Sequence, residues 1–265
     1  MKPAADPPIA SAANPAIKYI RSLQRHKGRE MERAFVLEGH RALADALELG
    51  VRPQLILIDA AMAPERLPNV PATVSVRLVA SSLFKELAAT QHPQGILAVV
   101  PFPEIAPKES SSPLTLVVDA VREPGNLGTL MRSAAATGVD RVALLPTTVD
   151  PYNAKVVRAG MGAHFRVALE ALDGSSLAQL IRSRSLVALL DARGEACYDD
   201  LDWNQPAAII VGGEAFGPTA TSWSFANVTV RIPLVGSIES LNAGVAGSVV
   251  LFEAARQRRA VGDSG

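Results

Sequence analysis

The sequence predicts an α/β protein with two domains, and three observations support this prediction. Segments of aliphatic and β-branched residues alternate with segments of helical periodicity along most of the 265 residues. Residues 114–121, LTLVVDAV, form a continuous apolar strand of the kind that is buried on both faces of a parallel sheet. Between two such alternating regions, residues 101–113 contain four prolines and three consecutive serines, a composition that neither a helix nor a central strand accepts.

These features divide the chain into four predicted segments. Residues 1–14 are rich in proline and alanine without an apolar signal core, so we expect a disordered tail. Residues 15–100 form a small α/β domain, residues 101–113 a linker, and residues 114–260 a larger, mostly parallel α/β domain.

Composition narrows the classes of function. With 48% hydrophobic residues, 20% charged residues and a net charge of zero, the chain is a folded, soluble protein, and a uniformly basic nucleic-acid binder is excluded while local basic patches are not. Apolar runs stay well short of the ~20 residues that a membrane helix needs. The single Cys197 excludes an intrachain disulfide and a cysteine-cluster metal site. We therefore expect a cytoplasmic protein.

The first domain begins with a basic helical stretch at residues 16–33, in which Ile17, Ile20 and Leu23 are spaced as one helix face. Two interpretations of its charge stay open, a solvated helix face or a surface that contacts RNA phosphates. Further along, we expect strands at 35–37, 54–59, 74–79 and 96–100, and helices at 41–49 and 81–88, with Ser81 as the N-cap of the latter. The candidate RNA-binding residues are Lys18, Arg21, Arg25, Lys27 and Arg29.

The second domain carries polar residues in the loop that follows its first strand. Asn126 is placed as the N-cap of a helix that begins near Leu127 and ends at Gly138, with Arg132 in the first two turns. Open α/β sheets bind ligands at this carboxyl end of a strand. The loop lacks the G-x-G-x-x-G turn of dinucleotide-binding enzymes, and the chain has no P-loop lysine motif.

Two later loops also carry polar residues at or after the end of a predicted strand. Glu214 follows an apolar strand at 208–211, where an acid can serve function or cap the next helix. Ser240 and Asn242 precede a terminal helix on which Val245, Val249 and Phe252 recur at helical spacing. Further strands are expected at 141–146, 186–190 and 228–232. The cationic residues expected to form a rim over this ligand face, together with Arg132, are Lys155, Arg158, His164 and Arg166.

Three motifs occur in a fixed order, N-L-G-x-x-x-R, then G-x-E-x-x-G, then I-P-x-x-G-x-x-x-S-L-N before a helix containing R-Q-R. Together they resemble the SpoU (TrmH-type) RNA ribose 2′-O-methyltransferases of the SPOUT superfamily, over residues 114–259. The domain at 15–100 is similar to the family's N-terminal substrate-binding domain. Gly244 departs from the family pattern, where serine is common, and Pro218 stands where leucine or methionine is frequent.

This resemblance implies a parallel sheet whose C-terminal segment is threaded into a deep trefoil knot, and a homodimer with its active site at the interface. It also implies S-adenosylmethionine as the cofactor and no metal. The positions matched to the cofactor are Gly212, Gly213, Ile232 and Leu241. The positions matched to catalysis or its support are Asn126, Arg132, Glu214, Ser240 and Asn242.

The expected activity is methyl transfer to a ribose 2′-hydroxyl of structured RNA, with 23S-type rRNA favoured. A transfer RNA substrate, or a non-catalytic RNA-binding or ribosome-assembly factor of the same fold, stays open; a nicotinamide oxidoreductase is disfavoured by the missing glycine motif. Arg132 either accepts the hydroxyl proton or clamps phosphate and stabilises the alkoxide. The small face made by Ala243, Gly244, Ala246 and Gly247 is expected to pack closely against a partner subunit.

Overall fold

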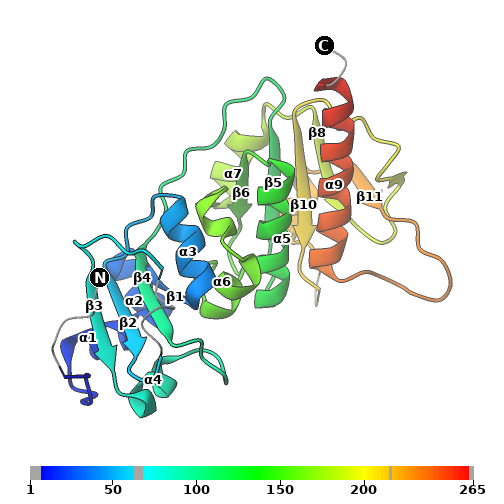
Figure 1. Cartoon of the computed structure of the whole chain (residues 1–265). Coiled ribbons are helices and arrows are strands. Elements are labelled where there is room, and N and C mark those ends of the chain that lie inside the picture. Colours follow the sequence, from blue (N-terminus) through cyan, green and yellow to red (C-terminus); the bar gives the residue numbers. More distant parts are fainter. Residues whose placement is uncertain (1–6, 63–67, 215–216, 263–265) are drawn as a thin grey trace. The chain divides into compact units, whose positions relative to one another are not determined.

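The computed structural model describes residues 7–62, 68–214 and 217–262 (Figure 1). These residues form two compact units: the first contains the described residues up to 103 together with 152–165, and the second contains 104–151 and the described residues from 166 onwards. The assignment of 152–165 to the first unit differs from the continuous second domain that the sequence predicted. Within the predicted disordered tail, Ile9 is buried and its backbone N–H donates to Leu78 O at 2.8 Å, so at this residue the prediction is wrong.

The first unit contains a four-stranded mixed sheet of order β1-β4-β2-β3. Strand β4 is antiparallel to β1 and β2, and β2 is parallel to β3. Alternate residues along the strands face two apolar clusters, one around Phe35 and Ile56 and one around Leu57 and Leu97. The strands are β1 (Ala34–Glu38), β2 (Leu55–Asp59), β3 (Ser75–Val79) and β4 (Ile96–Pro101). The helices are α1 (Pro15–Leu23), α2 (His26–Glu32), α3 (His40–Glu48), α4 (Ser81–Leu87), α6 (Ala154–Gly160) and the 3₁₀ turn η2 (Ala163–Phe165).

Local capping corrects two predicted elements of this unit. Asn14 caps α1 by accepting from Ala16 N at 2.9 Å, and the chain then turns before α2, so the stretch predicted as one helix forms two. The turn is tight, because a Cβ on Gly28 would lie 2.0 Å from Ser22 O. Helix α4 has Ala80 at its N-cap, and Ser81 instead donates its hydroxyl to Asp59 Oδ1.

The second unit contains a seven-stranded sheet of order β7-β6-β5-β10-β8-β11-β9, in which every strand pairing is parallel. This confirms the predicted mostly parallel sheet, with β7 and β9 as strands that the sequence did not predict. The strands are β5 (Leu114–Asp119), β6 (Arg141–Leu144), β7 (Ala168–Ala171), β8 (Leu186–Leu190), β9 (Ala196–Cys197), β10 (Ala207–Gly212) and β11 (Val228–Arg231). The helices are α5 (Pro124–Thr137), α7 (Gly174–Ile181), α8 (Ala220–Phe225) and α9 (Ala243–Gly262). No helix in the described ranges is long and apolar enough to cross a membrane.

The small face of α9 packs against α5 of the same chain (Figure 1). A Cβ on Gly247 would lie 2.4 Å from Leu130 Cδ2, and one on Gly244 would lie 3.2 Å from Thr129 Cβ. The prediction that this face meets a partner subunit is therefore wrong. The opposite face carries two exposed apolar residues, Val245, which is 46% exposed, and Phe252, which is 49% exposed.

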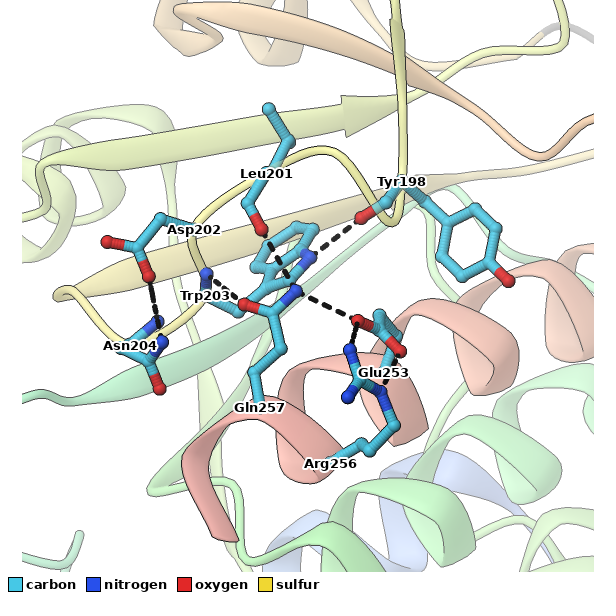
Figure 2. A network of polar contacts seen from close by, with 8 residues as sticks. All are labelled: Tyr198, Leu201, Asp202, Trp203, Asn204, Glu253, Arg256 and Gln257. Carbon is cyan, nitrogen blue, oxygen red and sulfur yellow. Dashed lines mark hydrogen bonds and ion pairs between the residues drawn. The ribbon is translucent and has the colours of Figure 1, made fainter. Parts of the chain in front are cut away.

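The C-terminal half of α9 is tied to the loop after β9 by the polar network in Figure 2. The buried Trp203 donates its backbone N–H to Gln257 Oε1 at 2.9 Å and its indole N–H to Tyr198 O at 2.8 Å. Gln257 in turn donates to Leu201 O and to Glu253 Oε1. Arg256 also donates to Glu253, and this hydrogen bond is the main reason that the pKa of Glu253 is lowered. The indole thus fills the space between the loop and the helix while its polar groups stay paired.

Replacing Trp203 by Ala is expected to lower the free energy of unfolding by about 3–5 kcal/mol, because a fully buried indole leaves a cavity. Denaturant unfolding followed by circular dichroism measures this loss. The matched control is Trp223→Ala, since Trp223 is 45% exposed and its removal is expected to cost less than about 1 kcal/mol. Equal losses for both variants would contradict the role given to Trp203.

Candidate active site

The parallel pairing of β5 and β10 sets two loops side by side at the carboxyl edge of the sheet. Asp119, the last residue of β5, is in register with Gly212, the last residue of β10. Asp119 is 1% exposed and accepts from Ser222 Oγ at 2.7 Å and from Thr219 N at 2.6 Å. Sequence reasoning missed this positioning carboxylate, although an acid that ends an apolar strand was a visible signal. It fixes the chain that follows Gly217.

Asn126 lies at the centre of a polar cluster made from all three predicted loops. Its Nδ2 donates to Glu214 Oε1, and its Oδ1 accepts from Asn242 Nδ2 at 2.8 Å. An asparagine amide offers both a donor and an acceptor, so it can join a carboxylate to a second amide. Asn126 is buried, whereas Glu214 and Asn242 are exposed. The structure therefore brings together Asn126, Glu214 and Asn242.

Asn126 reaches this position because it is not the N-cap that the sequence predicted. Helix α5 begins earlier, at Pro124, and Glu123 occupies the N-cap and accepts from Gly125 N at 3.4 Å. Asn126 is consequently in the first turn, with its side chain free to point at the neighbouring loops. Asn242 does act as a cap, since its Oδ1 accepts from Val245 N at 3.1 Å at the start of α9.

A cavity of about 360 Å³ lies against this cluster, a size typical of small-molecule sites. Its lining includes all four residues matched to the cofactor, Gly212, Gly213, Ile232 and Leu241, and also Glu214, Ser240 and Asn242. Backbone forms much of the wall. A Cβ on Gly213 would lie 2.2 Å from Ala120 O, and one on Gly212 would lie 2.5 Å from Pro218 N. The glycines are needed because the loops meet backbone to backbone.

One side of the cavity comes from a loop that the sequence reasoning did not assign. Asp191 and Ala192, directly after β8, line it together with Pro218 and Val230. Asp191 Oδ1 accepts from Arg193 N at 2.7 Å, which shapes the turn. The signal was again an acid at the end of an apolar strand.

Arg132 is the one predicted catalytic residue that the fold of a single chain does not bring to the cluster. It is exposed on α5 and is absent from the cavity lining. Ser240 does line the cavity and is exposed. A single copy of the chain thus contains the cavity and the Asn126 cluster, with Arg132 elsewhere on its surface.

The candidate RNA-binding residues of α1 and α2 differ in exposure. Lys18, Arg25 and Lys27 are exposed, and Arg21 is half-buried in an ion pair with Glu86 at 2.9 Å. Arg29 is 5% exposed and donates to Leu23 O at 2.8 Å. Its prediction as a surface residue is wrong, because the turn between α1 and α2 rotates the second helix and directs Arg29 inward.

The residues of the predicted cationic rim are divided between the two units. Lys155, Arg158 and His164 belong to the first unit, where all three line another cavity, and Arg166 belongs to the second unit but is not among the residues that line the cofactor cavity. His164 is buried among aromatic rings, with Phe35 at 5.6 Å and Tyr152 at 5.7 Å between ring centroids.

Comparison with known proteins agrees with this geometry. Residues 113–252 match the SpoU rRNA Methylase family, and residues 14–98 match the MRM3-like substrate binding domain. The chain is 29% identical to the 23S rRNA (guanosine(2553)-2′-O)-methyltransferase RlmP of Bacillus subtilis, over 92% of this chain and 97% of the relative.

Two solved structures are similar over nearly the whole chain. The SpoU methyltransferase AviRb from Streptomyces viridochromogenes, in complex with AdoMet (S-adenosylmethionine), has a TM-score of 0.82 at 26% identity and covers 93% of this chain and 98% of its own. An RNA 2′-O ribose methyltransferase has a TM-score of 0.81 at 32% identity, with 96% of this chain and 100% of its own covered. The chain belongs to the SpoU rRNA methylase family.

Proposed function

We propose that this chain is an S-adenosylmethionine-dependent methyltransferase that modifies a ribose 2′-hydroxyl of 23S-type rRNA in the cytoplasm. The observation that carries the proposal is the Glu214–Asn126–Asn242 cluster beside a cavity with glycine-rich walls. The 2′-O chemistry named for the Bacillus relative and the cofactor in the AviRb complex support it.

The cavity fits the proposed cofactor in size and in the chemistry of its wall. Gly212 and Gly213 let the loop backbones approach one another at the cavity wall, and Ile232 and Leu241 add apolar surface for the purine. When bound, S-adenosylmethionine supplies a methyl group on a sulfonium, so the leaving group is a neutral thioether and the reaction needs no metal. These four residues hold the cofactor in the proposal.

The chain's own task is to orient a poor nucleophile, a ribose hydroxyl that releases its proton to water as its oxygen bonds to the methyl carbon and the carbon–sulfur bond breaks. Because Asn126 is anchored on both sides by Glu214 and Asn242, the cluster is preorganised to position a ribose hydroxyl. Ser240 offers a further hydroxyl on the cavity wall. Arg132 binds the RNA phosphate and stabilises the developing alkoxide, since a guanidinium stays protonated in proteins and gives up its proton only at a high cost.

We infer that two copies pair and that Arg132 of the partner subunit completes each site. Arg132 lies outside the cavity lining of its own chain, and α9 presents the exposed apolar residues Val245 and Phe252. Such a face is typical of a symmetric dimer interface. We also infer that the segment 232–242 is the last pass of a trefoil knot, because residues 230, 232, 240–243 and 246 line the same cavity as residues 190–192, 211–214, 217 and 218.

The test is incubation of the purified protein with methyl-labelled S-adenosylmethionine and unmodified large-subunit rRNA, small-subunit rRNA or tRNA. Label on a single ribose of large-subunit rRNA is expected. Label confined to tRNA would show that the substrate is tRNA and would contradict the proposed rRNA substrate. If the protein binds RNA but neither binds the cofactor nor labels any RNA, it is instead a non-catalytic assembly factor.

RNA affinity is expected to fall steeply with salt, because Lys18, Arg25 and Lys27 are exposed cations of α1 and α2 and the turn between them. Replacing all three by Ala is expected to reduce the slope of log K against log salt by about 2–3, which is the release of counterions from three phosphates. Filter binding across a salt series measures the slope, and Lys108→Ala in the predicted linker is the control. A slope equal to that of the unmodified protein would contradict a phosphate-contacting surface here.

A further inference from the structure

The first unit contains a second cavity, of about 520 Å³, which the proposed methyl transfer does not use. Strand β1, helix α3, the segment after α4 and the segment 152–165 surround it. All of these elements belong to one compact unit. The cavity is therefore a feature of this unit and not of the cofactor site, whose lining shares no residue with it.

Most of the cavity wall is apolar, and part of it is aromatic. Leu23, Val36 and Leu87 line it, and Phe165 and Tyr152 contribute rings from the segment 152–165. The Tyr152 ring is stacked on Phe102 at a centroid distance of 3.7 Å, which holds the ring in place. A wall of this kind favours a flat apolar group such as a nucleobase.

Three exposed cations, Arg41, Lys155 and Arg158, also belong to the lining. Within the described part of the chain, none of the three side chains forms an ion pair or a hydrogen bond. The acidic residues of the cavity lining are Glu38 and Asp45. Glu38 is already engaged, because its carboxylate accepts from Ala89 N at 2.9 Å and from Thr90 Oγ1. The cations are thus available to an anionic ligand.

We propose that this cavity binds an unpaired nucleotide of the RNA substrate, with the base inside and the flanking phosphates on Arg41, Lys155 and Arg158. An apolar, partly aromatic interior with cations at its exposed side matches the two halves of a nucleotide. The exposed amide of Gln94, also in the lining, offers a donor and an acceptor to a base edge. The proposal rests on RNA being the substrate and adds a site that selects single-stranded over paired RNA.

Two variants of the full-length protein test the two halves of the site separately. Arg158→Ala removes a cation, and Ala154→Trp places an indole in the cavity from an exposed position at the start of α6. The probes are a fluorescent RNA hairpin with an unpaired loop and a fully paired RNA duplex of equal length. Arg52→Ala is the control, since Arg52 is an exposed cation of the same unit outside the cavity lining.

Arg158→Ala is expected to weaken hairpin binding about three- to tenfold and to lower the salt slope by about 0.7, the value for one phosphate of a single strand. Ala154→Trp is expected to weaken hairpin binding about tenfold or more without changing the slope, because it blocks the base. Both variants should bind the duplex with the affinity of the wild type. The Arg52→Ala variant should bind the hairpin with the affinity of the wild type.

The proposal would be overturned if both variants bound the hairpin with the affinity of the wild type while their circular dichroism spectra were native. Equal loss for hairpin and duplex would also overturn it, since the cavity would then have no preference for unpaired nucleotides. Methylation by the unmodified protein separates the two proposals: if it methylates rRNA while both variants behave as wild type, only the nucleotide cavity fails.

Discussion

Replacement of Arg132 by Ala is expected to lower kcat about 10²- to 10³-fold while the affinity for S-adenosylmethionine stays unchanged. The reason is that Arg132 is absent from the cofactor cavity and, in the proposal, acts on the RNA phosphate and on the developing charge of the ribose oxygen. Single-turnover transfer of labelled methyl to rRNA measures the rate, and calorimetric titration measures cofactor affinity.

The matched control is Arg182→Ala, which removes another exposed arginine of the same unit. It should retain near-normal turnover. Turnover close to wild type in Arg132→Ala, with intact cofactor binding, would refute both roles considered for Arg132, as proton acceptor and as alkoxide stabiliser.

Gly213→Ala is expected to weaken S-adenosylmethionine binding about 5- to 150-fold. The added Cβ would lie 2.2 Å from Ala120 O, so backbone on one side of the cavity must shift, and overpacking of this kind costs about 1–3 kcal/mol. Ala120 cannot easily yield, because it already has a φ of 55° in the left-handed region. Calorimetric titration with S-adenosylmethionine measures the change.

Gly125→Ala is the control for this substitution, since its Cβ would meet nothing closer than Glu123 Oε1 at 3.7 Å. It should bind the cofactor like the unmodified protein. Unchanged affinity in a folded Gly213→Ala protein would place the cofactor outside this cavity.

The convergence of Asn126, Glu214 and Asn242 could be predicted from the sequence because each follows or borders the carboxyl end of a strand in a parallel sheet. The carboxyl ends of parallel strands share one edge of the sheet. Polar residues placed there therefore lie close together, independently of how the intervening helices pack. The same reasoning extends to Asp119 and Asp191, since each lies at the carboxyl end of an apolar strand of this sheet. Most strands and helices could also be predicted, because the spacing of apolar residues along the sequence differs between a strand and a helix.

The wrong predictions concern elements for which two local sequence signals compete, or for which contacts with distant residues determine the structure. Asn126 is a favoured N-cap residue, but Pro124 is favoured in the first turn, and α5 therefore begins one turn earlier with Glu123 at its N-cap. Arg29 was placed on a solvated face by assuming one continuous helix, and the turn after α1 reversed its direction. The assignment of 152–165 to the first unit depends on contacts between distant segments, which no local pattern encodes.

Complementation between two inactive variants tests most directly the claim that Asn126 and Arg132 serve one methyltransferase site from different subunits. Arg132→Ala and Asn126→Ala chains, each with its own affinity tag, are co-expressed and purified through both tags, so that every dimer contains one of each. One of its two sites then has both Asn126 and Arg132, and about half of the wild-type transfer of labelled methyl to rRNA is expected. Transfer no greater than that of the two parent variants would contradict the account.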